Sequence, residues 1–261
     1  MPALRVLVCV KRVPAPGAQI TLTADGRAID TRNLAFTTSP HEECAVEEAI
    51  RLVEAHGGDI TVLTVGPPEA EEQLRFSISV GAQHAILVTN DRVADGADPD
   101  PQATARAITE AVRALETEAG PFDLLLFGNE SADSGGFQVG VRVARALGRP
   151  IVNGIKAIDI SDAVLTARRE CDDGFEVYRL GLPAVIGVKE GINLPRYPTL
   201  PGRLRSKKAE VQRIIAEPPD GGLTMVRFET PAVEVTETVL LGTGAGAAGA
   251  VVDLFYELGL A

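Results

Sequence analysis

The residues best suited to chemistry lie in the stretch GNESADSGGFQVG, residues 128–140, which joins an apolar run to a helical pattern. Gly135 and Gly136 allow a ligand to approach the backbone closely. The free N–H groups at the start of a helix, with the positive end of its dipole, attract an anion. The sequence therefore predicts a seat for a nucleotide phosphate. The alternative is structural: Ser134 or Asp133 caps the helix, and the glycines only form the turn.

A second candidate is the start of the acidic helix predicted over residues 39–56. Ser39 is a suitable N-cap, Pro40 fits the first turn and Glu42 completes a capping box. This cap loop borders the end of the first strand, so its backbone is placed to contact an adenine or a ribose. His41 is interpreted as a surface residue, because nothing nearby in sequence orients it for acid–base catalysis. The other carboxylates are interpreted as a solvated face: Glu43, Glu47 and Glu48.

Motifs for other chemistries are missing. No GxGxxG follows the first strand and no GxxxxGK[ST] occurs, which argues against a Rossmann dinucleotide site and a Walker loop. We find no nucleophile elbow, no paired catalytic carboxylates and no metal-ligand spacing. Residues 172–174, Asp-Asp-Gly, are interpreted as a hairpin turn. The sequence therefore predicts a binding protein, with no catalytic residue and no metal.

The charge, the cysteines and the apolar stretches of the sequence exclude several classes of partner and site. The formal net charge of -11 argues against nucleic acid or an anionic membrane surface. The three cysteines are widely separated and form no CxxC, so neither a disulfide framework nor a zinc cage is expected. No stretch reaches the roughly 20 apolar residues of a membrane span, and the first residues lack the pattern of a signal peptide. We expect a soluble, cytoplasmic protein without direct membrane insertion.

The scaffold must bring the ends of several strands together. Strand patterns and helix patterns alternate, the strands at 4–10, 59–66, 84–90 and 122–128 and the helices at 39–56, 68–81, 101–120 and 137–148. Such units predict an α/β fold with a doubly wound, mostly parallel sheet, its first strand at the centre. Ligands of such sheets bind beyond the carboxyl ends of the strands. The ends to inspect follow Cys9, Val65 and Gly128.

The remaining segments depart from this alternation. Residues 20–30 predict a β-hairpin, and residues 151–160, 163–171 and 175–188 predict an antiparallel addition to the sheet. Residues 191–208, with three prolines and two glycines, are interpreted as an exposed loop. We expect a nucleotide-binding domain over residues 1–215. Residues 216–261 are expected to form an extended arm that ends in a short amphipathic helix and packs on a partner subunit.

Six stretches together resemble the beta subunit of electron transfer flavoprotein over nearly the whole chain. They are LVCVKRV (7–13), SPHEECAVEEAIRL (39–52), VGPPEAEEQLRFSISVGA (65–82), the 128–140 loop, ARRECDDGFEVYRLGLPAV (167–185) and NLPRYPTLP (193–201). The resemblance implies a fold like that of the adenine nucleotide alpha hydrolases. It also implies a heterodimer whose alpha subunit holds the redox-active FAD. The beta subunit then binds AMP, or a second FAD in electron-bifurcating members, and has no turnover of its own.

The resemblance further implies electron transfer from flavin dehydrogenases, such as acyl-CoA dehydrogenases, to a quinone-linked oxidoreductase. The family's nucleotide contacts would fall on Cys9, Ser39, Pro40, His41, Glu42, Val65, Gly128, Asn129, Glu130, Ser131, Ala132, Asp133, Ser134, Gly135, Gly136, Phe137, Gln138 and Val139. The family's dehydrogenase-docking segment would comprise Arg196, Tyr197 and Leu200, with Leu200 as the apolar anchor. The alternative for Leu200 is a side chain folded back on its own domain.

Three features of the loop bear on which nucleotide binds. The stretch ADSGGFQVG (132–140) lacks the carboxylate run common in AMP-type members, and its QVG resembles bifurcating members. Val141, in place of a proline usual after Gly140, argues the other way. We favour AMP over FAD. Two other classes stay open: an adenine-nucleotide sensor resembling universal stress proteins, and an adenylating or nucleotide-hydrolysing enzyme. The long segment after residue 190 argues against the first, and the lack of a phosphate-activating lysine loop argues against the second.

Overall fold

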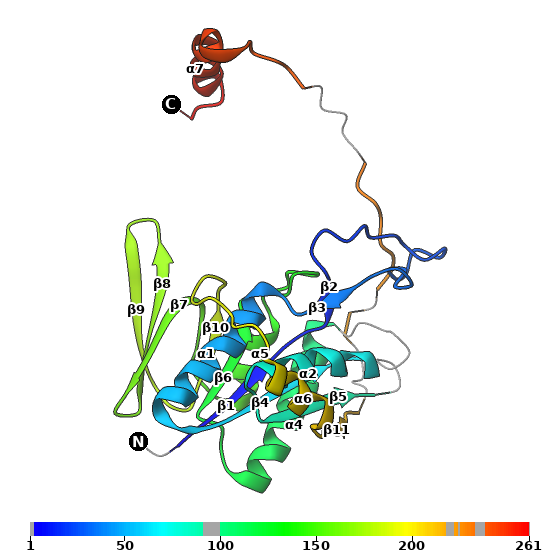
Figure 1. The fold of residues 1–261 in the computed structure, drawn as a ribbon, viewed down its shortest axis with the longest axis vertical. Coiled ribbons are helices and arrows are strands. Elements are labelled where there is room, and N and C mark those ends of the chain that lie inside the picture. Colours follow the sequence, from blue (N-terminus) through cyan, green and yellow to red (C-terminus); the bar gives the residue numbers. More distant parts are fainter. Residues whose placement is uncertain (1–2, 91–99, 218–221, 224, 233–237, 261) are drawn as a thin grey trace.

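A nine-stranded sheet forms the body of the protein, as seen in the computed structural model, which describes residues 3–90, 100–217, 222–223, 225–232 and 238–260. The strand order is β11-β5-β4-β1-β6-β10-β7-β8-β9 (Figure 1). Every pair from β11 to β7 is parallel, and β7, β8 and β9 are antiparallel. The α/β class, the mostly parallel sheet and the antiparallel addition are confirmed. The strands are β1 (Leu4–Cys9), β4 (Gly58–Val65), β5 (His84–Thr89), β6 (Leu124–Gly128), β7 (Ile151–Ser161), β8 (Val164–Cys171), β9 (Gly174–Gly181), β10 (Ala184–Val188) and β11 (Gln212–Ile215).

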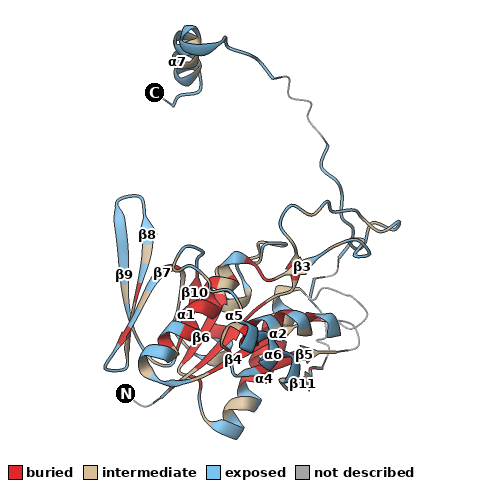
Figure 2. Cartoon of the chain, in the orientation of Figure 1, coloured by how far each residue is buried: buried red, intermediate tan, exposed pale blue. Residues whose placement is uncertain are grey.

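Helices cover both faces of this sheet. Along β1, Val6 and Val8 face the core under α1 (Pro40–His56) and α2 (Glu71–Val80), while Leu7 and Cys9 face the core under α4 (Pro101–Ala119) and α5 (Val139–Leu147). Alternate side chains of a strand point to opposite faces, so a strand buried on both sides is apolar throughout. Figure 2 shows the buried residues in the sheet and on the inward sides of the helices.

Helix α1 begins and ends where local signals place it. Ser39 is its N-cap and Pro40 its first residue, and the helix ends at His56 before two glycines with positive φ. Gly58 also needs to be glycine for space, because a Cβ there would lie 1.9 Å from the carbonyl oxygen of Leu4. The predicted boundaries of this helix are confirmed.

Two predictions about strands need correction. The hairpin expected over residues 20–30 is reduced to a turn with one isolated bridge between Leu22 and Ile29. Residues 175–188 form two strands, β9 and β10, which are separated at Leu182-Pro183. Proline has no N–H for the sheet, so the ladder is interrupted there. The fully buried β10 then returns to the parallel part of the sheet, between β6 and β7.

The predicted loop over residues 191–208 is half helical, since α6 (Leu200–Lys208) occupies its second part. The signal was present in the sequence: the Thr199 hydroxyl accepts from the N–H of Gly202 at 3.2 Å, and Pro201 lies in the first turn. Gly202 lets α6 pack closely on α2, because a Cβ there would lie 2.1 Å from the Ser79 carbonyl oxygen. The short edge strand β11, which pairs with β5, was also missed.

The arm has few contacts with the body among its described residues. Phe228 donates its N–H to the Gly26 carbonyl at 2.7 Å. The final helix, α7 (Ala248–Glu257), follows a 3-10 turn at Gly244–Ala247 and buries none of its residues. Figure 1 shows α7 set apart from the sheet. Residues 218–221, 224, 233–237 and 261 of the expected arm lie outside the described residues. A two-stranded ladder, β2 (Val13–Pro14) with β3 (Phe36–Thr37), completes the fold.

Candidate nucleotide site

The ends of β1, β4 and β6 meet at one edge of the sheet, which we call the carboxyl edge. In the parallel register Cys9 lies beside Leu63 of β4 and Phe127 of β6. The predicted site positions Cys9, Val65 and Gly128 are therefore brought together. Burial, and next the Glu42 carboxyl, raise the pKa of the Cys9 thiol well above its usual range. The thiol is therefore protonated at neutral pH and is no nucleophile.

Gly128 lies where the start of α1 crosses the end of β6. A Cβ at this position would lie 2.7 Å from Cγ of Glu42 and 3.2 Å from Cβ of His41. The close approach requires glycine and places the 128–139 loop directly beside the cap loop of α1. The two candidates found separately in the sequence, the phosphate loop and the acidic helix start, thus form one site.

Glu42 is buried and ties α1 to the end of β1. Its Oε2 accepts hydrogen bonds from the N–H of Lys11 at 2.9 Å and from the N–H of Ser39 at 3.3 Å, the second being half of the predicted capping box. Burial raises the pKa of Glu42 to about 8, although both N–H donors act to lower it. A carboxyl group that is mostly protonated at neutral pH does not repel an anion bound beside it.

Lys11 and Asp133 form an ion pair across the site, with 2.6 Å between Nζ and Oδ2. Burial acts to raise the pKa of Asp133, but the charge of Lys11 and the hydrogen bonds from Lys11, Ser131 and Ser134 together outweigh it, and the pKa is lowered. Asp133 also accepts from the N–H of Ser134 at 2.7 Å. Lys11 was not among the predicted site residues, although it follows the first strand directly, at one of the ends singled out for inspection.

The start of α5 carries no side-chain cap. The helix begins at Val139, two residues later than predicted, and its N-cap residue is Gln138. The alternative in which Ser134 or Asp133 caps this helix is therefore wrong. Since no side chain accepts from the first N–H groups of α5, these donors and the positive end of the helix dipole are available to an anion.

His41 is held between two elements and is not a free surface residue as predicted. Its Nδ1 accepts from the N–H of Glu190 at 2.8 Å, and its Nε2 lies 3.4 Å from Oε1 of Glu130. An acceptor at Nδ1 places the ring proton on Nε2, so the imidazole faces Glu130 as a donor. Only 12% of the side chain is exposed. Glu190 is 149 positions away in sequence, so no local pattern could indicate this contact.

The remaining predicted residues lie along the loop. Ser39 Oγ lies 3.5 Å from the Glu130 carbonyl, the Ser131 and Ser134 hydroxyls are 3.0 Å apart, and Asn129 donates its N–H to Val188 at 2.8 Å. Phe137 has an exposed ring and a φ of 54°, a region that favours glycine. The others belong to the same two segments: Pro40 begins α1, and Ala132, Gly135, Gly136 and Gln138 lie in the loop before α5. Among the described residues no group of His, Cys, Asp and Glu is arranged to hold a metal ion.

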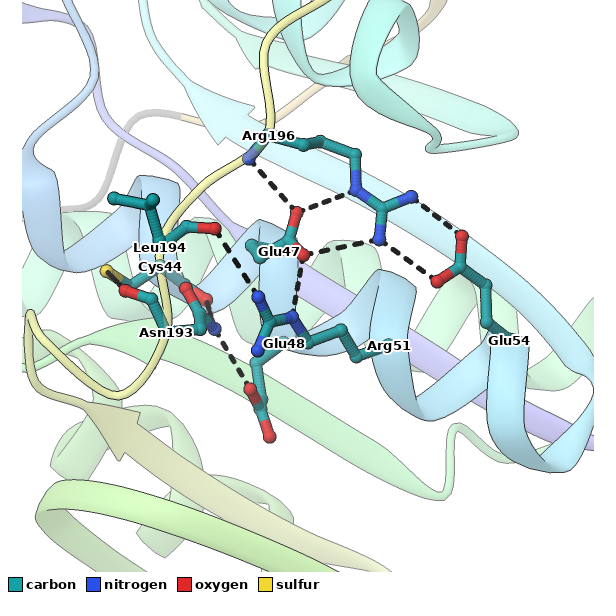
Figure 3. A network of polar contacts seen from close by, with 8 residues as sticks. All are labelled: Cys44, Glu47, Glu48, Arg51, Glu54, Asn193, Leu194 and Arg196. Carbon is teal, nitrogen blue, oxygen red and sulfur yellow. Dashed lines mark hydrogen bonds and ion pairs between the residues drawn. The ribbon is translucent and has the colours of Figure 1, made fainter.

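The acidic face of α1 is mostly buried, which corrects the expectation of a solvated face. Glu47 and Glu48 are buried and only Glu43 is partly exposed. Residues 190–196, which we call the strap, lie over this face and supply partners (Figure 3). A buried carboxylate needs such partners because desolvation of an unpaired charge is costly.

The predicted docking residues differ among themselves. The side chains of Tyr197 and Leu200 are 91% and 71% exposed, so the alternative in which Leu200 folds back on its own domain is wrong. The guanidinium of Arg196 is instead paired with Glu47 and Glu54 of α1. Arg196 is therefore directed toward its own domain.

The fold and the site define an α/β protein with a candidate anion seat at the carboxyl edge of a parallel sheet. The family model described as "Electron transfer flavoprotein domain" matches residues 28–219. The chain is similar to "Electron transfer flavoprotein subunit beta" of Syntrophomonas wolfei, with 35% identity over 87% of this chain and 86% of the relative. It is also similar to the mitochondrial beta subunit of Oryza sativa subsp. indica, with 31% identity over 90% and 89%.

A third relative, "Protein FixA" of Bradyrhizobium diazoefficiens, is 33% identical over 81% of this chain and 73% of its own length. The chain therefore belongs to the electron transfer flavoprotein family. The resemblance to its beta subunits inferred from the sequence is confirmed. No helix among the described residues is long and apolar enough to cross a membrane.

Proposed function

We propose that the chain is the beta subunit of a heterodimeric electron transfer flavoprotein and that it binds AMP at the carboxyl edge. The observation that carries the nucleotide proposal is the ion pair of Lys11 with Asp133, in the loop that leads to the uncapped start of α5. A phosphate there gains a cation and helix N–H donors in a chain whose net charge is otherwise -11. Gly128, with no side chain between the loop and α1, brings the loop directly against the cap loop of α1.

The residues suit an AMP phosphate. Lys11 and the first N–H groups of α5 hold the anion, and the neutral carboxyl of Glu42 avoids repulsion. The cap loop at Ser39 and His41 provides backbone and ring contacts for the nucleoside. The redox chemistry is supplied by the FAD that the alpha subunit holds, so this chain is an electron-carrier subunit without turnover of its own.

Tyr197 and Leu200 form the surface proposed for docking a flavin dehydrogenase, from which electrons pass to a quinone-linked oxidoreductase. Both side chains are exposed and stand close together in sequence between Pro195 and Pro201, which restrict the backbone. An apolar anchor on a stiff segment loses little conformational entropy when it binds. The arm from residue 216 onward is proposed to pack on the alpha subunit.

Counting the nucleotides tests the proposal. The chain is copurified with its alpha subunit, the complex is denatured, and the released nucleotides are identified by mass spectrometry. We expect one FAD and one AMP per heterodimer. A value near two FAD would replace AMP by a second FAD, and a complex without any nucleotide beyond the FAD of the alpha subunit would contradict the site. A chain that stays a stable monomer beside its alpha subunit would favour a stand-alone nucleotide sensor.

A further inference from the structure

The strap, residues 190–196, connects the end of β10 to the exposed docking surface and is fastened along α1. At its first residue the N–H of Glu190 donates to Nδ1 of His41 at 2.8 Å. At its middle Nδ2 of Asn193 donates to the carbonyl of Cys44 at 3.0 Å. The strap therefore follows the helix from its start toward its carboxyl end, and Figure 3 shows the part from Asn193 to Arg196.

The last residue of the strap, Arg196, makes the strongest of these attachments. Its Nε donates to Glu47 at 2.8 Å and its Nη2 to the same carboxylate at 3.2 Å. Its Nη1 and Nη2 also donate to Glu54, at 2.7 and 3.0 Å. Four of the five guanidinium N–H donors are therefore directed at carboxylates of α1. Little of the guanidinium is left for a partner protein.

We call the contacts of the Arg196 guanidinium with Glu47 and Glu54 the clamp. Its two carboxylates differ in how far they are exposed to water. Glu47 is only 4% exposed, whereas the side chain of Glu54 is 59% exposed. Charge-assisted bonds in fork geometry are strongest where one carboxylate is shielded from water. Arg196 also donates its backbone N–H to Glu47 at 3.3 Å, so both its side chain and its main chain are fixed.

The docking surface begins at the residue after this clamp. Tyr197 follows Arg196 directly, and Leu200 opens α6 three residues later. On the other side the segment is held by Gly202, where α6 packs against the Ser79 carbonyl. The exposed residues therefore lie on a short segment, residues 197–201, which we call the bridge. It is held at one end on α1 and at the other end on α2.

We propose that Arg196 is a positioning residue, which holds the exposed Tyr197 and Leu200 in place through its clamp to Glu47 and Glu54 and does not itself touch the dehydrogenase. This inference rests on the docking role proposed above. Without the guanidinium contacts the bridge is held on the α1 side only by Asn193 and by the main-chain N–H of residue 196, so it samples more conformations and loses more entropy when a partner binds. Glu47 keeps Arg51 as a partner at 2.7 Å, so the core around α1 stays intact.

The first test measures the conformational order of the strap in the absence of a dehydrogenase. Hydrogen exchange of the amides of residues 190–199 is compared in wild type, Arg196→Gln and Arg196→Lys, all as heterodimers. We expect about tenfold faster exchange in Arg196→Gln, as for the loss of a hydrogen bond to a charged group, and a smaller increase in Arg196→Lys. Arg203→Gln on α6 is the matched control, with the same charge change outside the clamp and no expected effect. Unchanged protection in Arg196→Gln would overturn the proposal.

The second test separates positioning from direct contact. The rate of electron uptake from an acyl-CoA dehydrogenase is measured for the same variants. We expect the rate to be lowest in Arg196→Gln, intermediate in Arg196→Lys and highest in wild type, the reverse of the order of their exchange rates. Slower uptake with full protection of the strap would show instead that Arg196 contacts the partner. If Leu200→Ala leaves electron uptake unchanged, the docking role is wrong. The hydrogen-exchange measurement still tests whether Arg196 fixes the strap, because it does not depend on a partner.

A third variant covers the case in which Arg196→Gln does not fold. Glu54→Gln removes the exposed half of the clamp and leaves buried Glu47 paired. We expect a smaller acceleration of exchange in the same amides. Because the chain has no tryptophan, Tyr197→Trp adds its only tryptophan at the bridge, and the anisotropy of this residue, excited selectively, should fall when Glu54→Gln is introduced. No change in either measurement would overturn the proposal.

Discussion

At the residue scale, α1 carries three buried glutamates whose surroundings give them different charges. Burial raises the pKa of Glu42 to about 8 and, despite a hydrogen bond from Asn193, also raises the pKa of Glu48. Burial acts in the same direction on Glu47, but hydrogen bonds from Arg196 and Arg51 outweigh it and lower the pKa. One helix therefore presents a neutral acid at the proposed nucleotide site and a carboxylate anion at the strap.

Glu42→Gln should flatten the pH dependence of stability. The folded carboxyl holds its proton more tightly than the unfolded one, so wild-type stability is full below about pH 4.5 and falls as the pH rises toward 8. We expect the wild type to lose about 2 to 4 kcal/mol more than the variant between pH 5 and 8.5, measured by urea unfolding. The same pH profile in both proteins would contradict the assignment.

Glu54→Gln provides a contrast of opposite sign. Hydrogen bonds from Arg196 lower the pKa of Glu54, so its contribution to stability is present at neutral pH and is lost on acidification. The variant should therefore differ from wild type at pH 7 and converge with it at acid pH. Equal differences at both ends of the range would argue against the ion pair.

Lys11→Gln should weaken nucleotide binding more than other changes of the same charge. The lysine supplies a cation at the loop that leads to α5, and a charge-assisted contact to phosphate contributes on the order of 2 kcal/mol. We expect about tenfold or greater loss of AMP affinity, measured by calorimetry on nucleotide-stripped heterodimer. Lys208→Gln on α6 serves as the control. Equal affinities for the two variants would remove Lys11 from the site.

At the element scale, the sequence predicts what local signals determine. The capping residues and Gly57 give the ends of α1, and apolar runs give the parallel strands at whose ends the site lies. The cover over the acidic face of α1 was not predicted, because Asn193 and Arg196 lie about 150 positions from their partners. The sequence does not predict helix α6, because three prolines between residues 195 and 201 indicate a loop, although Pro201 fits a first helical turn.

The same distinction applies to the site. Its strand ends and its loop were predictable, since parallel strands end at a common edge. The contacts that complete it, Lys11 with Asp133 and His41 with Glu190, join segments that only the folded sheet brings together. A hydrophobic pattern does not contain this information.

Gly128→Ala tests how closely β6 and α1 meet. The added methyl would lie 2.7 Å from Cγ of Glu42, so the cap loop has to shift. Overpacking of this kind typically costs about 1 to 3 kcal/mol, and nucleotide retention should fall with it. The matched control is Gly181→Ala, where a Cβ meets no atom within 4 Å. Thermal unfolding that shows equal stability for both variants would contradict the close approach.

Leu200→Ala tests the surface at the start of α6. The side chain is exposed, so its loss should leave the heterodimer and its flavin intact and slow electron uptake from the dehydrogenase. We expect about a tenfold or larger effect if Leu200 is the anchor, measured by stopped-flow reduction. Ile215→Ala, another exposed apolar residue, is the control. Unchanged uptake in Leu200→Ala would remove the docking role.

At the scale of the whole molecule, the sheet domain and the arm differ in how they are stabilised. The domain has two buried clusters, one on each face of the sheet, whereas α7 leaves Val252, Phe255 and Tyr256 exposed. An exposed apolar helix beyond an extended segment fits a surface on another chain. The proposed division at residue 216 follows this difference.

Removing residues 238–261 should therefore separate folding from assembly. We expect the thermal unfolding of the isolated domain to change little, because none of the residues of α7 is buried. Association with the alpha subunit, followed by gel filtration, should weaken by at least about tenfold. Assembly as tight as that of the full chain would contradict a role for the arm at the subunit interface.

We propose that the phosphate of an adenine nucleotide lies at the carboxyl edge, between Lys11 and the first turn of α5. The most direct measurement is an experimental structure of the heterodimer purified with its own nucleotide. We predict phosphate density within hydrogen-bond distance of the N–H groups at the start of α5 and of the Lys11 ammonium. A heterodimer whose nucleotide lies elsewhere, or whose carboxyl edge is filled by its own side chains, would contradict the account.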